Sequence, residues 1–340
     1  MRRLGAILFI IGVGAVSLFL TSNSDHVTIR MHWTYLHSKI QPQTTSAFSS
    51  MVSDPQLKGL VYYDASTKEI FLLSRGQWHL VYSKVNSGIW FADPIMAYDP
   101  IYKYLVLFGV KDQAVKGRVI QESQTWILSA NGWQRIRTAI SPPPLFGSSL
   151  GCDPNTGQCV LFGGIERVSS DAKSMHPIRL SAETWIWNGS TWKQIHTVHH
   201  PSARFIASMT WDAYTHQLIL FGGLFSYPMN HYSDTWIWAG KSWHIVSRSH
   251  NLMPDQLPEP MTYDPNMKGL VLLNMNKSKM QEWLWDGKAW KLLAPNFASP
   301  LLNQSNYALQ MQYDNADHYL VLYVRHWTKS GESYRTYVLK

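Results

Sequence analysis

Several features that would indicate an enzyme are missing from this sequence. It has only two cysteines, Cys152 and Cys159, and only 15% of its residues are charged. It contains no nucleophile elbow, no H-E-x-x-H zinc motif, no P-loop and no Cys-x-x-Cys pair. We therefore expect a non-enzymatic protein with no catalytic residues and no cofactor.

Concentrated charge is also missing. The formal net charge is +8, yet no run of five basic residues occurs anywhere in the chain. A diffuse basic surface permits contact with acidic polymers or anionic surfaces, but an ordinary solvated surface is the favoured explanation. We expect no nucleic acid partner.

Long apolar runs are absent except at the start of the chain. Leu4–Leu20 carries no charge and directly follows Arg2 and Arg3. This pattern is typical of an export signal, and its length is at the lower limit of a membrane span. No A-x-A cleavage site follows, so residues 1–24 are predicted to be a signal anchor or, alternatively, a cleaved signal peptide. Because the arginines precede the span, the body is expected outside the cytoplasm, membrane-anchored or secreted.

What the chain does contain is an internal repeat. Each copy opens with an aspartate, followed six positions later by Leu or Cys and nine positions later by Tyr, Phe or Leu. The six aspartates are Asp54, Asp99, Asp153, Asp212, Asp264 and Asp314. A period of roughly 50 residues with short strands is the length of one propeller blade. The sequence thus predicts an all-β, six-bladed propeller of four-stranded antiparallel blades over residues 25–340.

The clearest copy shows how one blade is built. An apolar strand, Val160–Phe162, runs into the glycine pair Gly163–Gly164. Two aromatic strands follow, Thr184–Trp187 and Trp192–Ile195. The first five copies repeat the seven-residue spacing between the aromatic residue of the third strand and the tryptophan of the fourth. We expect these tryptophans to form core between blades rather than a sugar platform.

The sixth copy lacks its fourth strand, because the chain ends at Lys340. Residues near 31–37 can supply it, since Trp33 precedes Asp54 by the same interval that separates Trp243 from Asp264. We predict that this N-terminal strand pairs with the C-terminal strand and closes the ring. Closure would remove two exposed sheet edges.

Five segments resemble kelch repeats. Residues 162–164 and 221–223 read FGG, 183–185 and 234–236 read ETW and DTW, and 201–204 read PSAR. The resemblance implies a β-propeller similar to that of galactose oxidase. Blades one, five and six depart from the family pattern, because DA, NM and VR stand at the glycine-pair positions 64–65, 274–275 and 324–325.

The cysteines flank one turn of the third blade. Cys152 and Cys159 should therefore face each other on adjacent strands. A disulfide is the expected state outside the cytoplasm, with a free buried pair as the alternative.

Loop lengths predict where recognition occurs. The turns between first and second strands, and between third and fourth strands, are short. The other connections are long and variable, the longest being roughly 165–182, and all of them open on the opposite face. Candidate ligand-binding residues concentrate there in blades three and four: His176, His199, His200, Arg204, Tyr227, His231 and Tyr232. We expect a monomer that binds a protein or a glycan, including an acidic one, through this face.

A metal-dependent oxidoreductase or lyase is the alternative. His199 and His200 beside His231 and Tyr232 could form a metal site, and galactose oxidase holds copper with two Tyr and two His. That enzyme also crosslinks one Tyr to Cys, and both cysteines here lie at a short turn instead. We therefore expect no metal, and we expect Arg204 to brace loops rather than bind an anion.

Overall fold

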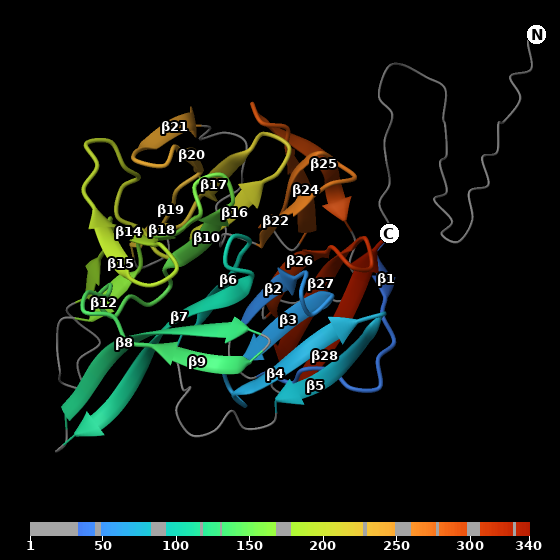
Figure 1. Cartoon of the computed structure of the whole chain (residues 1–340). Helices are drawn as coiled ribbons and strands as arrows, with labels where there is room; N and C mark the ends of the chain where they lie inside the picture. Colours follow the sequence, from blue (N-terminus) through green and yellow to red (C-terminus); the bar gives the residue numbers. More distant parts are fainter. Residues whose placement is uncertain are drawn as a thin grey trace, which may run out of the picture.

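The computed structural model shows six four-stranded antiparallel sheets arranged in a ring (Figure 1). It describes residues 33–44, 49–82, 93–115, 118–129, 131–167, 178–226, 230–248, 260–276, 279–297, 307–328 and 331–340. The predicted fold class is confirmed: the chain is an all-β, six-bladed propeller. The expected N-terminal hydrophobic helix lies outside the described residues. No helix in the described ranges is long and apolar enough to span a membrane.

The first three blades follow the chain in order. Blade one consists of β2 (Ser50–Asp54), β3 (Gly59–Asp64), β4 (Glu69–Ser74) and β5 (Gln77–Tyr82). Blade two consists of β6 (Ile95–Asp99), β7 (Tyr104–Val115), β8 (Arg118–Ser129) and β9 (Gly132–Ile136). Blade three consists of β10 (Ser149–Asp153), β11 (Gln158–Phe162), β14 (Thr184–Trp187) and β15 (Trp192–Ile195), with an extra ribbon of β12 (Ile165–Arg167) and β13 (Ile178–Leu180).

The last three blades repeat this order. Blade four consists of β16 (Ser208–Asp212), β17 (Gln217–Phe221), β20 (Asp234–Trp238) and β21 (Trp243–Arg248), with a ribbon of β18 (Leu224–Ser226) and β19 (Asn230–His231). Blade five consists of β22 (Met261–Asp264), β23 (Gly269–Asn276), β24 (Lys279–Trp285) and β25 (Trp290–Phe297). Blade six consists of β26 (Tyr307–Asp314), β27 (Tyr319–Thr328), β28 (Gly331–Leu339) and β1 (Thr34–Tyr35).

The two ends of the chain close the ring, as predicted. β1 pairs with β28 in antiparallel register, with Thr34 opposite Val338 and Tyr35 opposite Tyr337. The Leu36 N–H donates a further hydrogen bond to the Thr336 carbonyl at 2.8 Å. The sixth blade is thus completed by residues from the opposite end of the chain.

The repeated aspartate stabilises the turn between the first and second strands. Asp99 Oδ1 accepts the backbone N–H groups of Ile101 at 3.0 Å and Tyr102 at 3.1 Å, and the other five blades repeat the arrangement. The last residue of each turn has a positive φ between 52° and 66°: Lys58, Lys103, Gly157, His216, Lys268 and His318. We call the side carrying these turns and the third-to-fourth-strand turns the turn face, and the opposite side the loop face.

A hydrogen bond from tryptophan to threonine joins neighbouring blades. The fourth-strand tryptophan Nε1–H of one blade donates to the third-strand threonine Oγ1 of the preceding blade. The pairs are Trp78–Thr336 (2.9 Å), Trp192–Thr125 (2.7 Å), Trp243–Thr184 (3.0 Å) and Trp290–Thr235 (3.0 Å). Blade one has Ile70 at the threonine position, and Trp133 Nε1 of blade two has no hydrogen-bond partner among the described residues. The expectation that these tryptophans form core between blades agrees with their burial.

The expectation of a long loop after every second strand is wrong for four blades. In blades two, five and six the second and third strands continue as extended hairpins, and β7 and β8 pair as far as Val115 opposite Arg118. In blade one a tight turn joins β3 to β4, where Asp64 Oδ1 accepts the N–H of Ser66 at 2.8 Å. The long second-to-third-strand connections of blades two, five and six are therefore built as additional strand, because no glycine pair interrupts the ladder there.

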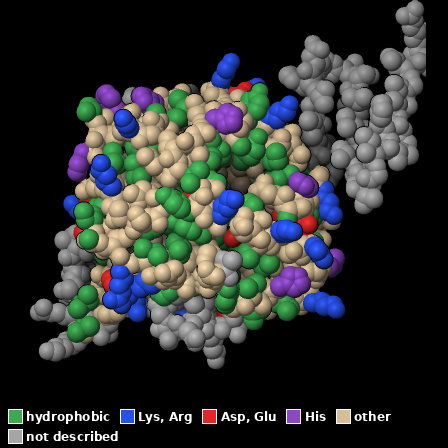
Figure 2. Space-filling model, in the orientation of Figure 1, with side chains coloured by type: hydrophobic (Ala, Val, Ile, Leu, Met, Phe, Trp, Pro, Cys, Tyr) green, Lys and Arg blue, Asp and Glu red, His purple; other side chains and the backbone are tan. Residues whose placement is uncertain are grey.

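Positive charge is spread over the surface. Figure 2 shows Lys and Arg side chains scattered across one side of the molecule, with few Asp or Glu side chains visible among them.

Candidate functional site

The glycine pair of blade three admits the segment that leads into blade four. Gly163 and Gly164 have φ values of +71° and +106°, which disfavour any residue with a side chain. The Gly164 N–H donates to the Arg204 carbonyl at 2.8 Å. A Cβ on Gly163 would come closer than 3.0 Å to that same carbonyl oxygen. The sequence pair Gly-Gly thus places the following connection directly against blade three.

The two-stranded ribbons of blades three and four form backbone contacts with the connections that lead into these blades. Phe146, before blade three, forms a bridge with Ile165 at the start of β12. Phe205, before blade four, forms the equivalent bridge with Leu224 at the start of β18. The Ile206 N–H also donates to the Gly147 carbonyl at 2.6 Å, which ties the two connections together. The loop face over blades three and four is therefore built from backbone that is hydrogen-bonded across blades.

Arg204 lies at the centre of this arrangement with none of its surface exposed. Its guanidinium forms a bidentate pair with Asp234 at 2.5 and 2.9 Å and donates to the Gly222 carbonyl at 2.7 Å. Its Cζ lies 4.0 Å from the centroid of the Tyr232 ring. A buried charge that is paired and hydrogen-bonded in this way holds its neighbours in place.

The other candidate residues lie at different depths. Tyr232 is half-buried and packs on Phe225, with ring centroids 4.6 Å apart. His231 lies half-buried in β19, whereas His199 and His200 are exposed between β15 and β16. His176 and Tyr227 lie outside the described residues. Within the described ranges, no group of three or more His, Cys, Asp or Glu residues could hold a metal ion.

Two exposed apolar side chains on the loop face were missed by the sequence reasoning. Val198 is 92% exposed and Ile140 is 58% exposed. Both lie in connections that lead into a proline, Pro201 after Val198 and Pro142 after Ile140. When the two connections are aligned on Pro142 and Pro201, Ile140 falls one position after Val198, so the alignment would have placed both residues in the same part of the loop face.

A second polar region, at the junction of blades six and one, was also missed. Arg325 pairs with Glu332 at 3.0 Å and lies over the Trp327 ring at 4.7 Å. In blade one, Asp64 is fully buried, and the buried rings of Tyr62 and Tyr323 face each other across the junction, with centroids 5.0 Å apart. The signal was present, because Asp64 and Arg325 occupy the positions where blades three and four have glycine.

Glu282 departs most clearly from the repeat. It stands in β24 where Thr235 stands in β20, and only 1% of its surface is exposed. Neither carboxylate oxygen has a hydrogen-bond partner among the described residues. Burial, with a smaller contribution from Asp264, raises the pKa of Glu282 to about 7. Because Glu282 lies within a blade rather than at a loop, we assign its effect to stability.

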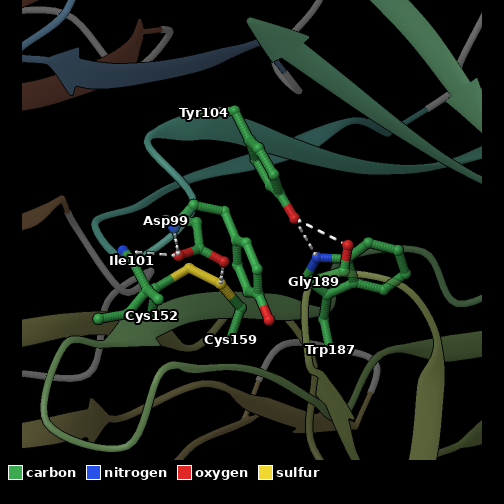
Figure 3. The surroundings of a disulfide bond; sticks show 8 residues. Asp99, Ile101, Tyr104, Cys152, Cys159, Trp187 and Gly189 are labelled. Carbon is green, nitrogen blue, oxygen red and sulfur yellow. Dashed lines mark hydrogen bonds between the residues drawn. A yellow bond between two sulfur atoms is a disulfide. The ribbon is translucent and has the colours of Figure 1, made fainter.

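The cysteines lie at the turn face, away from these candidates. Cys152 and Cys159 are paired in register and form a disulfide, and Asp99 of blade two approaches Cys159 with Oδ2 3.6 Å from Sγ (Figure 3). Nearby, the Tyr104 hydroxyl donates to the Gly189 carbonyl at 3.1 Å and accepts from Trp187 Nε1 at 3.2 Å. The disulfide therefore lies at the junction of blades two and three.

Solved structures share this fold at low sequence identity. The chain is similar to YjhT, with a TM-score of 0.61 and 12% identity over 88% of this chain and 96% of YjhT. It is also similar to a proposed oxidoreductase (glucose dehydrogenase) from Thermus thermophilus, with a TM-score of 0.55 and 11% identity over 92% of this chain and all of that one. No family model and no curated protein sequence matches the chain. At such identities the likeness establishes the propeller fold alone.

Proposed function

We propose that this protein is an extracytoplasmic, kelch-like binding propeller that recognises a partner through the loop face of blades three and four. The partner is a protein or a glycan, and a protein is favoured. The kelch assignment is supported by the Gly-Gly, Glu/Asp-Thr-Trp and Pro-x-x-Arg segments, all of which make the contacts described above. The location outside the cytoplasm is supported by the apolar N-terminal segment and by the Cys152–Cys159 disulfide.

One observation carries the proposal. The connections that lead into blades three and four are held by hydrogen bonds, yet each exposes an apolar side chain to solvent. Arg204 and the two ribbons hold the backbone below, while Val198 and Ile140 point their aliphatic side chains into solvent. Ordering a loop before its partner arrives lowers the entropy cost of binding. Exposed aliphatic groups favour a protein surface, since a sugar platform would need an open aromatic face and the Tyr232 ring is covered by Arg204 and Phe225.

The test is a capture experiment with matched charge substitutions. Purified protein is immobilised and exposed to envelope extract, and bound proteins are identified and measured individually. Val198→Asp should reduce the affinity for a captured partner by about tenfold or more, because it places a charge in an apolar contact. Ile101→Asp, on the turn face and 51% exposed, is the control and should leave binding unchanged.

Three outcomes are informative. Equal loss in both variants, or no loss in either, would contradict recognition by the loop face. Binding on a glycan array that is lost in Val198→Asp would identify a glycan as the partner. A stoichiometric copper or zinc ion that is lost in His199→Ala would favour the enzyme alternative over the binding protein.

A further inference from the structure

The two faces of the propeller differ in how many of their cations form salt bridges within the protein. On the loop face, four arginines form salt bridges within the protein: Arg135 with Glu122, Arg179 with Glu166, Arg204 with Asp234 and Arg325 with Glu332. On the turn face, the described residues form one such pair, Lys291 with Asp286 at 2.7 Å. The remaining cations of the turn face are therefore available to a partner.

These available cations lie on the turns of blades one, two, four and five and at the C-terminal end of blade six. They are exposed and form no salt bridge with any described residue: Lys58, Arg75, Lys103, Lys241, Lys268, Lys288 and Lys340. Lys58, Lys103 and Lys268 have φ values of 52°, 57° and 52°. A left-handed conformation costs such residues roughly 1 kcal/mol, and Gly or Asn would fit more easily. Lysine occupies these three positions against the local backbone preference.

The turns of adjacent blades form one continuous surface. The Tyr102 hydroxyl of blade two donates to the Asn188 carbonyl of blade three at 2.8 Å. The Gly76 N–H of blade one donates to Asp317 Oδ2 of blade six at 3.1 Å. Tyr102 and Tyr214 are 50% and 55% exposed among the cations. Exposed tyrosine beside lysine is typical of side chains at a membrane–water interface.

The turn aspartates limit how far this charge acts. All six are buried just behind the exposed cations, and their carboxylates accept backbone N–H groups. At a distance their negative charge offsets the cations, and at physiological salt interactions are screened beyond about 8 Å. The face therefore attracts an anionic surface only at close range, so it suits orientation of a tethered body better than recruitment from solution.

The chain reaches the body from this same side. Trp33 directly precedes β1, and the next residue, Thr34, is opposite Val338 near the C-terminus. Leu339, at the C-terminal end of β28, pairs with Leu320 close to the Asp314 turn, so this end of the chain lies at the turn face, to the right in Figure 1. Residues 21–32 connect the predicted membrane segment to Trp33 and can reach at most about 40 Å. A body attached in this way is held near the membrane by its turn face.

We propose that the turn face lies against anionic lipid headgroups of the membrane that holds the N-terminal segment, so that the loop face points away from the bilayer. This inference rests on the membrane attachment in the proposed function. It goes beyond that function by assigning a lipid-contacting surface to the lysines of the aspartate turns.

Amine-reactive footprinting of the full chain in vesicles tests the proposal. The protein is reconstituted with its body outside, in phosphatidylcholine vesicles with or without phosphatidylglycerol, and each lysine is quantified by mass spectrometry. Phosphatidylglycerol should slow labelling of Lys58, Lys103 and Lys268 by about fivefold. Lys111, which lies in the β7–β8 hairpin on the loop face, should change little. High salt should remove the protection.

Matched variants separate charge from folding. Lys103→Asn with Lys268→Asn removes two turn-face charges and should remove the protection of Lys58, while Asn tolerates the left-handed backbone. Lys111→Asn with Arg137→Asn removes the same charge on the loop face, since Arg137 is exposed directly after β9, and should leave that protection intact. Uniform protection, or protection of Lys111 instead, would overturn the proposal.

Flotation of the same samples distinguishes the two claims. If the chain floats with neutral vesicles but shows no selective protection with anionic ones, the anchor holds and the oriented turn face is wrong. If it floats only with anionic vesicles, the anchor prediction fails and the turn face alone binds lipid. If it floats with neither, both the membrane attachment and this inference are wrong.

Discussion

Blades four and five meet through a neutral hydrogen bond, whereas the side of blade five nearest blade six presents a carboxyl group. At the first junction Trp290 of blade five donates to Thr235 of blade four at 3.0 Å. At the equivalent position of blade five, Glu282 is buried with neither oxygen bonded among the described residues. The same repeat position therefore supports the ring in one place and weakens it in another.

The contrast extends to the second strands. Blades three and four end them at a glycine pair, which admits the next connection and begins a separate ribbon. Blades five and six continue them into long hairpins instead. Blades three and four thus use their extra residues to build a braced loop face, while blades five and six use them to lengthen their second and third strands. Three experiments test whether these differences between the blades affect stability.

The largest effect is expected from the pH dependence of Glu282. Its pKa is raised from the ordinary 4.5 to about 7, so the folded protein holds a proton that the unfolded chain releases between these values. The free energy of unfolding should therefore fall by about 3 kcal/mol as the pH rises from 4.5 through 7, and then level off. Denaturant unfolding at pH 5 and pH 8 measures this change.

Glu282→Gln and Glu282→Thr are the matched variants. Both remove the ionisable group, so each should lose this part of the pH dependence and be more stable than the wild type at pH 8. If the variants and the wild type lose equal stability between pH 5 and pH 8, Glu282 is not the source of the difference between the junctions.

A slightly smaller effect is expected for Gly163→Ala in blade three. The left-handed φ of +71° and the approach of the new Cβ to the Arg204 carbonyl should together cost about 3 kcal/mol. Gly76→Ala is the control, because its φ is almost the same at +69° and the nearest atom is 3.6 Å away. Backbone strain alone should cost it about 1 kcal/mol. Equal loss in thermal unfolding would show that the close approach of the Arg204 segment is unimportant.

The smallest effect is expected for Thr235→Val. Removing the hydroxyl leaves the buried Trp290 Nε1–H without its acceptor, which should lower the free energy of unfolding by about 1 to 2 kcal/mol. Thr235→Ser keeps the hydroxyl and should lose less in denaturant unfolding. If serine and valine are equally destabilising, the lost methyl packing, and not the hydrogen bond, explains the result.

The repeat predicted most of the fold because its signals are local. Asp99 and its five equivalents need only the next three residues to form their turns, so their spacing located every blade. Trp33 could be assigned to the sixth blade from the same spacing. The hairpin lengths could not be predicted, because whether a ladder continues beyond Phe108 or stops at Gly163 depends on how the next blade approaches.

The sequence predicted less of the candidate site than of the fold. The motif around Arg204 indicated a brace, and the buried pair with Asp234 agrees with that expectation. Exposure of Val198 and burial of Glu282 depend on contacts between blades, which a single repeat does not encode. A position that departs from its five equivalents is nevertheless visible in the sequence, and Glu282, Asp64 and Arg325 all depart in this way.

The pairing of β1 with β28 also constrains the order of folding. Thr34 is among the first residues of the body to be synthesised, and its partner Val338 is among the last. Blade six therefore cannot be completed until Val338 is available, and until then the edge of β1 and the junction beside Trp78 are open. Such a long-range contact slows folding and leaves aggregation-prone strand edges exposed until it forms. A chaperone that covers unpaired strand edges is therefore expected to bind this body most strongly before β28 has joined β1.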